Sequence, residues 1–323
     1  MGSVKIGLIG GGTVALSFLQ QVKNVNIPLS VSAILVENKS KSRNFNRIPF
    51  TCDLEEFKRY PFDILVDASS GGVELWPLFE WSLKQRKPLI SANKKLLVDK
   101  FDDFHDLARE TQTPLLYEAA CAAAIPILKT LNDYYSQIPI KSIKGIINGS
   151  CNYILSEMEK GLSFNEALNR AQKKGYAETD PYLDVSGEDA RNKLLLLIYH
   201  AFGQKLSREE VELKGISALK ASDFIKAKSL GKTIKLIAEA KLEDGKVFAT
   251  VKPMYLDKTI SLAQASGAQN IIEVESFAKQ NEFFLGEGAG GVATTLALTS
   301  DVIAAINNYK YKALLPLDLA FSK

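Results

Sequence analysis

The first half of the chain alternates short apolar segments with longer amphipathic ones. The short segments are branched or aromatic and are bounded by turn-forming or polar residues, which predicts strands. They lie at residues 4–9, 31–36, 64–66, 88–91 and 114–117. Between them, apolar residues recur at helical spacing over 14–22, 73–83 and 101–110. Alternating strands and helices are typical of a parallel sheet covered on both faces, so we expect a doubly wound α/β domain over residues 1–135.

The pattern changes at about residue 140. One predicted strand is followed by a run of helices and then by further strands, which is typical of an α+β domain with a mixed sheet. The strands are expected at 142–147, 234–241, 246–253, 270–276 and 283–286, and the helices at 152–160, 164–174 and 187–202. We therefore expect an inserted second domain over residues 136–286. The last predicted helix, 293–307, is expected to return to the first domain, so that residues 287–323 complete it.

Composition and charge agree with two globular domains and narrow the class of ligand. Of 323 residues, 46% are apolar and 24% charged, which is ordinary for a protein with sizeable cores. The formal charge of +3 comes from 40 basic and 37 acidic residues without long blocks of one sign. This balance favours a small-molecule substrate over nucleic acid or a membrane surface. No apolar run approaches the ~18 residues of a membrane span.

Histidine and cysteine are scarce. The chain has two histidines and three cysteines, with no CxxC pair. A zinc site or a Ser-His-Asp site needs such residues in defined arrangements, and neither is supplied here. An odd number of cysteines and an N-terminus without a secretory signal indicate a reducing compartment, so we expect the cytoplasm.

A glycine-rich element follows the first predicted strand. Gly10 and Gly12 belong to a G-x-G-x-x-A pattern that opens a helix through Thr13 and Val14 and ends at Ala15. Glycine allows a tight turn and a close approach of the backbone to a pyrophosphate at the helix N-terminus. Its place between a strand and a helix, at the start of a strand–helix series, favours dinucleotide binding over a structural turn.

The residues after the second predicted strand bear on the choice of dinucleotide. Glu37 can bind a ribose 2′-hydroxyl, as in NAD sites, whereas basic residues such as Arg43 can bind the 2′-phosphate of NADP. Asn38 lies between them and is a further candidate. Both cofactors stay open, with a slight preference for NADP.

Two polar segments follow later strands of the same domain. Ser69 and Ser70 come after the strand at 64–66, and Ser91, Asn93 and Lys94 come at the end of the strand at 88–91. Ligands of open α/β sheets bind at the carboxyl ends of the strands, so we expect these residues to line the cofactor, with Lys94 also facing the substrate. A turn and a helix start are the alternative interpretation.

The segment 175–193 has the densest polar chemistry. Ser186 and Asp189 fit a capping box, and Asp189 and Lys193 form an i, i+4 pair, so stabilisation alone is one interpretation. The same helix is apolar nearly all round and should be buried, which shifts the pKa of an unpaired ammonium toward proton transfer. Four carboxylates are expected near this lysine and favour a site for a zwitterionic substrate: Glu178, Asp180, Asp184 and Asp189.

Six segments, in this order, resemble the homoserine dehydrogenase family. They span most of the chain and are residues 7–15, 91–95, 117–126, 145–155, 175–193 and 286–305. The resemblance implies a Rossmann-type domain that binds NADP or NAD and an inserted domain that binds substrate and forms a homodimer. The implied reaction interconverts L-aspartate 4-semialdehyde and L-homoserine, toward threonine, isoleucine and methionine.

The resemblance also implies roles for individual residues. Lys193 matches the catalytic lysine that protonates the aldehyde oxygen, and Lys94 matches a second lysine of the site. Asp189 would hold Lys193 in place, and Gly288 would lie at the cofactor. The implied substrate contacts are Tyr176, Glu178, Asp184 and Asp189.

A monovalent cation, Na⁺ or K⁺, is implied in the segment 118–125. Its ligands would be the Glu118 side chain and the carbonyls of Cys121, Ala123 and Ile125. The family pattern has glycines where this chain has alanines from residue 122 to 124, and alanine disfavours glycine's special backbone conformations. Two other functions stay open at this point, namely another Rossmann enzyme acting on amino acids and a nucleotide-sensing protein without turnover.

Overall fold

The computed structural model describes residues 2–38, 45, 47–278, 281–288 and 290–312. These residues form two compact units. The N-terminal unit contains the described residues up to Ala123 together with 290–312, and the second unit contains the described residues from Ala124 to 288. The sequence predicted this division after residue 135. The structure instead places helix α6 (Ile127–Asp133) in the second unit, which begins at Ala124.

The N-terminal unit is built on a parallel sheet, as predicted. Its strands have the order β3-β2-β1-β4-β5-β6, and every neighbouring pair is parallel. They are β1 (Val4–Ile9), β2 (Leu29–Leu35), β3 (Phe50–Thr51), β4 (Ile64–Asp67), β5 (Leu89–Ser91) and β6 (Leu115–Leu116). The strand order reverses between β1 and β4, which is the switch point of a doubly wound dinucleotide-binding fold. The predicted fold class is confirmed.

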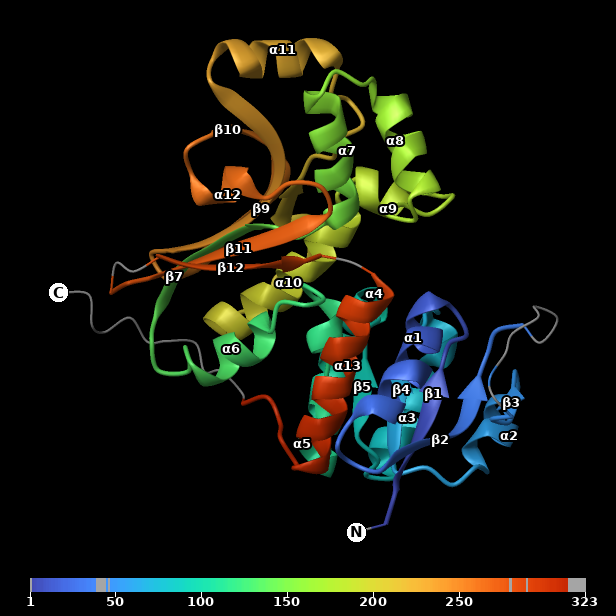
Figure 1. Cartoon of the computed structure of the whole chain (residues 1–323). Helices are drawn as coiled ribbons and strands as arrows, with labels where there is room; N and C mark the ends of the chain where they lie inside the picture. The colour runs from blue at the N-terminus through green and yellow to red at the C-terminus, as the bar shows by residue number, and fades with distance from the viewer. Residues whose placement is uncertain (1, 39–44, 46, 279–280, 289, 313–323) are drawn as a thin grey trace. The chain divides into compact units, whose positions relative to one another are not determined.

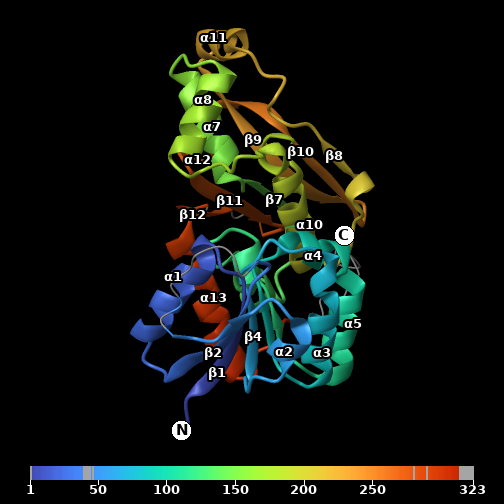
Figure 2. The ribbon, with the colours of Figure 1, turned by 90° about the vertical axis from the view of Figure 1, so that its right-hand side faces the viewer.

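Helices cover both faces of this sheet. They are α1 (Thr13–Gln21), α2 (Leu54–Lys58), α3 (Trp76–Lys84), α4 (Lys94–Asp99), α5 (Phe101–Thr111) and α13 (Gly291–Ile306). Figure 2 shows α1 and α13 on one side of the sheet and α2, α3 and α5 on the other. Apolar residues of α1 and α13, such as Phe18 and Leu298, share one buried core with Ile6 and Val66 of the strands. The apolar stripe of α13 is therefore buried in the unit that begins the chain.

The second unit contains a six-stranded sheet of order β12-β11-β7-β9-β10-β8. Neighbouring strands are antiparallel except β10 and β8, which are parallel, so the predicted mixed sheet is present. The strands are β7 (Ile140–Ile146), β8 (Val211–Leu213), β9 (Lys232–Glu243), β10 (Lys246–Asp257), β11 (Gln269–Ser276) and β12 (Asn281–Glu287). Asp244 and Gly245 both have positive φ and form the tight hairpin between β9 and β10.

Helices of the second unit hold the polar site described below. They are α6, α7 (Gly149–Glu159), α8 (Phe164–Lys173), α9 (Tyr182–Val185), α10 (Glu188–Phe202), α11 (Ala221–Ser229) and α12 (Ser261–Gln264). Figure 1 shows α7 next to α8. Four successive leucines of α10, from Leu194 to Leu197, are buried, as its sequence predicts. None of the helices in the described ranges is long and apolar enough to cross a membrane.

Candidate active site

The glycine-rich turn after β1 has the geometry of an anion site. Gly10 has φ +110°, and a Cβ there would lie 2.8 Å from the carbonyl oxygen of Ala68. Gly12 precedes α1, and no atom of the described residues lies within 4 Å of a Cβ added there, so these residues leave the space in front of the helix open. α1 begins at Thr13 and Val14 with no side-chain cap and no acidic residue in its first turn. Its backbone amides and positive dipole end therefore suit a pyrophosphate.

The residues expected to select the cofactor follow β2. Glu37 and Asn38 are exposed at the end of that strand. Arg43 lies outside the described residues. The geometry therefore supports a dinucleotide without choosing between NAD and NADP.

A polar network occupies the carboxyl ends of β4 and β5. Asp67 Oδ1 accepts hydrogen bonds from the backbone N–H and the hydroxyl of Ser69, at 3.0 and 2.6 Å. Asp67 Oδ2 accepts one from the Ser91 hydroxyl at 2.9 Å. Desolvation by complete burial raises the pKa of Asp67 to about 6, although these hydrogen bonds oppose the shift. The neighbouring Ser70 is exposed.

The segment after β5 ends this network at a helix start. The Ser91 hydroxyl accepts a hydrogen bond from the Asn93 N–H at 3.0 Å, and Asn93 Oδ1 accepts one from the Leu96 N–H at 3.2 Å. Asn93 is thus the N-cap of α4. Lys94, half-buried, is the first residue of that helix. The backbone position of Lys94 is therefore fixed by the Asn93 cap.

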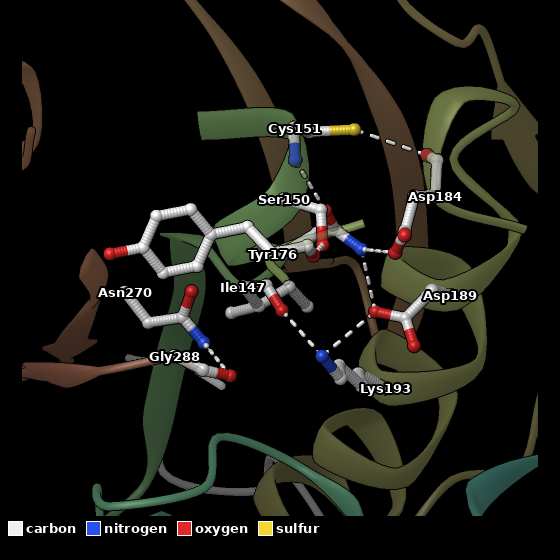
Figure 3. A network of polar contacts seen from close by, with 10 residues as sticks. Ile147, Ser150, Cys151, Tyr176, Asp184, Asp189, Lys193, Asn270 and Gly288 are labelled. Carbon is white, nitrogen blue, oxygen red and sulfur yellow. Dashed lines mark hydrogen bonds and ion pairs between the residues drawn. The ribbon is translucent and has the colours of Figure 1, made fainter. Parts of the chain in front are cut away.

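The second unit holds Lys193 in a buried polar network. Lys193 Nζ pairs with Asp189 Oδ2 at 2.8 Å and donates to the carbonyl oxygen of Ile147 at 2.9 Å. Asn148 Nδ2 donates to Asp189 Oδ2 at 2.8 Å and to Asp184 Oδ1 at 2.7 Å (Figure 3). Helix α10 therefore brings its i, i+4 pair to the end of β7, where the backbone and Asn148 complete the contacts.

Neighbouring side chains complete this part of the site. Cys151 Sγ contacts the carbonyl oxygen of Asp184 at 3.1 Å, and burial raises the pKa of its thiol well above the usual range. The Ser150 hydroxyl donates to the carbonyl of Tyr176. The ring of Tyr176 lies 4.8 Å from that of Tyr153, centroid to centroid, and Tyr176 is 39% exposed. Tyr176 is thus fixed at its backbone and accessible at its ring.

The four expected carboxylates are not equally placed. Asp184 and Asp189 meet at Asn148, whereas Glu178 and Asp180 are exposed on the loop before α9. Asp180 Oδ1 accepts the Tyr182 N–H in a local turn. No role for Asn148 was predicted from the sequence. Its signal was a polar residue between a buried strand and a helix, where it also caps α7 by accepting the Cys151 N–H at 2.7 Å.

The segment expected to hold a cation joins the two units along the chain. Glu118 is 2% exposed, and its backbone N–H donates to Asp301 Oδ2 at 2.9 Å. Ala123 has φ +49°, so this alanine adopts the left-handed conformation that glycine usually supplies. Cys121 is buried, and Ile125 belongs to the second unit. Carboxylate and carbonyl oxygens are suitable ligands for a hard cation. In the described part of the chain, no cluster of three or more His, Cys, Asp or Glu side chains is placed to hold a metal.

Comparison with known proteins identifies the family. A family model described as homoserine dehydrogenase matches residues 126–303, which is more than half of the chain. A second, described as homoserine dehydrogenase, NAD binding domain, matches residues 6–118. The chain belongs to the homoserine dehydrogenase family.

Individual members of the homoserine dehydrogenase family are similar to this chain over nearly its full length. The homoserine dehydrogenase of Bacillus subtilis is 30% identical over 322 residues, covering 96% of this chain and 74% of that protein. The one from Synechocystis is 35% identical over 315 residues, covering 93% and 73%. A crystal structure from Thiobacillus denitrificans superposes with a TM-score of 0.90 at 28% identity, over 98% of this chain and 78% of that one.

A further structural neighbour shares the fold. A hyperthermophilic archaeal homoserine dehydrogenase solved with NADPH has a TM-score of 0.81 at 23% identity, over 96% of this chain and all of that one, which shows a shared fold. Homoserine dehydrogenases are NAD(P)-dependent oxidoreductases, and this chain is therefore one too. Its role in amino-acid biosynthesis follows from the family.

Proposed function

We propose that Lys193 exchanges the proton in the interconversion of L-aspartate 4-semialdehyde and L-homoserine, and that Asp189 positions it. The buried ion pair between them supports this assignment, because their side chains are only 10% and 9% exposed. A buried ammonium is costly unless it is paired, and Asp189 supplies the paired charge. Two carboxylates and one amide around a single lysine exceed what a helix start requires.

The proton transfer follows from this arrangement. Toward homoserine, the aldehyde carbon gains a hydride and its oxygen gains a proton. The nicotinamide of NAD(P)H supplies the hydride when it is bound. Lys193 donates the proton from Nζ, and water returns one to the neutral amine. In the opposite direction, neutral Lys193 accepts the proton of the hydroxyl.

Substrate and cofactor contacts are assigned to the residues that the resemblance indicates. Asp184 and Glu178 are suited to a substrate ammonium, Tyr176 contributes an exposed ring, and Lys94 contributes a second cation. The proposed cofactor residues are Gly10, Gly12, Thr13, Val14, Asn38, Arg43, Ser69, Ser70, Ser91, Asn93, Lys94 and Gly288. The open, uncapped N-terminus of α1 supports the first four of these.

Steady-state oxidation of NADPH and of NADH with aspartate semialdehyde tests the proposal. We expect turnover with at least one coenzyme, with a preference for NADPH. A panel of other amino acids and their aldehydes should give no comparable rate. Binding of either coenzyme without turnover would instead indicate a nucleotide-sensing protein and refute the proposal.

Assembly as a homodimer is also proposed. Strand β12 lies at one edge of the second sheet, with Phe283 44% and Leu285 59% exposed. Apolar side chains on a sheet edge favour self-association. Light scattering should give about twice the 35.5 kDa chain mass.

Two further assignments complete the proposal. A monovalent cation would be held by Glu118 and by the carbonyls of Cys121, Ala123 and Ile125, and exchange of Na⁺ or K⁺ for a bulky organic cation should lower thermal stability. The cytoplasm is the proposed compartment, supported by three free cysteines, of which Cys121 and Cys151 are buried.

A further inference from the structure

Asp67 is a buried carboxylate to which neither the resemblance nor the proposed mechanism gives a role. It is the last residue of β4 and is completely buried. Its two oxygens accept three hydrogen bonds, two from Ser69 and one from Ser91. One side chain thus joins the segment after β4 to the segment after β5.

Further hydrogen bonds close this network into a ring. The Ser69 hydroxyl accepts the Gly71 N–H at 3.3 Å, and Asn93 Nδ2 donates to the Gly71 carbonyl at 2.7 Å. The Ser91 hydroxyl accepts the Asn93 N–H at 3.0 Å. The two segments therefore contact each other both directly and through Asp67, and the ring ends at the cap of α4, whose first residue is Lys94.

The same point of the sheet is tied to the glycine-rich turn. The Ala68 N–H donates to Ile9 O at 2.9 Å, and the Ala92 N–H donates to Asp67 O at 2.9 Å. The carbonyl of Ala68 also faces Gly10, where a Cβ would be 2.8 Å away. The segments after β1, β4 and β5 thus form one hydrogen-bonded layer at the carboxyl edge of the sheet.

The place of this layer in the fold indicates which part of the dinucleotide it faces. The first βα turn binds the pyrophosphate, and residues after β2 bind the ribose that carries the 2′-phosphate in NADP. The strands beyond the switch point, β4 and β5, therefore lie under the other half, which carries the nicotinamide.

Burying a carboxylate is costly unless hydrogen bonds replace its hydration. The desolvation that raises the pKa of Asp67 to about 6 is the physical sign of that cost. Three strong acceptor contacts, which a neutral amide cannot all provide, are what the carboxylate adds. The carboxylate of Asp67 therefore fixes the segments after β4 and β5 relative to each other at this edge.

We infer that Asp67 is a positioning residue for the nicotinamide half of the coenzyme. It acts through Ser69 and Ser91 to hold the segments 69–72 and 92–94, and through the second segment it fixes the start of α4 at Lys94. This inference rests on the proposed function, because it takes these segments to line the coenzyme.

Asp67→Asn tests the inference, because it preserves shape but leaves one acceptor oxygen in place of two. We expect KM and Kd for NAD(P)H to rise about tenfold or more, since small misplacements in such sites are costly. KM for homoserine at saturating coenzyme should rise by a smaller factor, because Lys94 is the only proposed substrate contact within the segments that Asp67 holds. Asp67→Ser, which is smaller and keeps one hydroxyl acceptor, replaces it if Asp67→Asn does not fold.

Asp63→Asn is the matched control. Asp63 precedes the same strand at its opposite end, is exposed, and accepts the Lys5 N–H at 2.8 Å. This variant should leave KM for coenzyme unchanged. Unchanged coenzyme binding in a folded Asp67 variant, even with lower thermal stability, would overturn the inference. Failure of the wild-type protein to turn over would instead contradict the proposed function.

Discussion

Gly288 and Asn270 are in such close contact that adding one methyl group at Gly288 should measurably lower the stability of the protein. Asn270 of β11 is completely buried, and Gly288 follows β12, which pairs with β11. A Cβ at Gly288 would lie 2.1 Å from Asn270 Oδ1 and 2.2 Å from its Cγ. β11 pairs with β7 on one side and β12 on the other, so the backbone of Asn270 cannot shift to relieve this contact.

We therefore expect Gly288→Ala to lower the free energy of unfolding by about 3 kcal/mol, the upper part of the range for overpacking. The φ of Gly288 is not in the left-handed region, so alanine brings no backbone strain and the effect isolates the steric overlap. Urea unfolding followed by far-UV circular dichroism measures the change, since both tryptophans, Trp76 and Trp81, belong to the other unit.

Asn270→Ala supplies the decisive comparison. Its Nδ2 contacts the Gly288 carbonyl only at 3.5 Å, and its buried Oδ1 has no hydrogen-bond partner among the described residues. Truncation should therefore cost only about 1 kcal/mol, because an unsatisfied polar group is removed with the packing. The double variant should recover about 2 kcal/mol relative to the sum of the single ones. Strict additivity would refute the steric explanation.

Three further predictions follow from buried groups. Lys193→Met should lower kcat about 10²–10⁴-fold while coenzyme Kd, measured by nucleotide fluorescence, stays within about twofold; a weakened Kd with normal kcat would contradict the proposed role. Folding raises the pKa of Asp67 from 3.8 to about 6, so the folded state binds the proton of this carboxyl more tightly than the unfolded state does. The free energy of unfolding should therefore be highest below pH ~4 and fall by about 3 kcal/mol as pH rises through ~6. Urea unfolding from pH 4 to 7 should show this loss relative to Asp67→Asn, and parallel curves would count against it. A thiol reagent should modify exposed Cys52 in the native protein and reach Cys121 and Cys151 only after unfolding; three fast equivalents would disagree with their burial.

The sequence predicted most of the long elements because their signals are local, but it did not predict the nine-residue α11. β1 was placed at its observed bounds, and α10 was recognised by its continuous apolar surface. β3 has two residues and α2 has five, too few for a periodic pattern to emerge. These short elements depend on tertiary contacts, which a single sequence does not display.

The sequence indicated which residues belong to the site, but not all of the contacts between them. The i, i+4 spacing of Asp189 and Lys193 is visible in the sequence, and burial of α10 makes the pair significant. That Asn148 bridges two carboxylates depends on the end of β7 meeting α10, which only the fold determines. The same holds for Asp67, whose partners lie at the ends of neighbouring strands.

Helix α13 has a consequence for how the protein is made. The core beneath α1 is completed by α13, yet residues 124–289, 166 in number, are synthesised between the two parts of the N-terminal unit. At about 5–20 residues per second, the ribosome needs roughly 8–30 s to cover that distance. During this interval the face that later receives Leu298 and Val302 is exposed to solvent and to chaperones. A nascent chain that ends before residue 290 therefore lacks α13 and carries an incomplete core beneath α1.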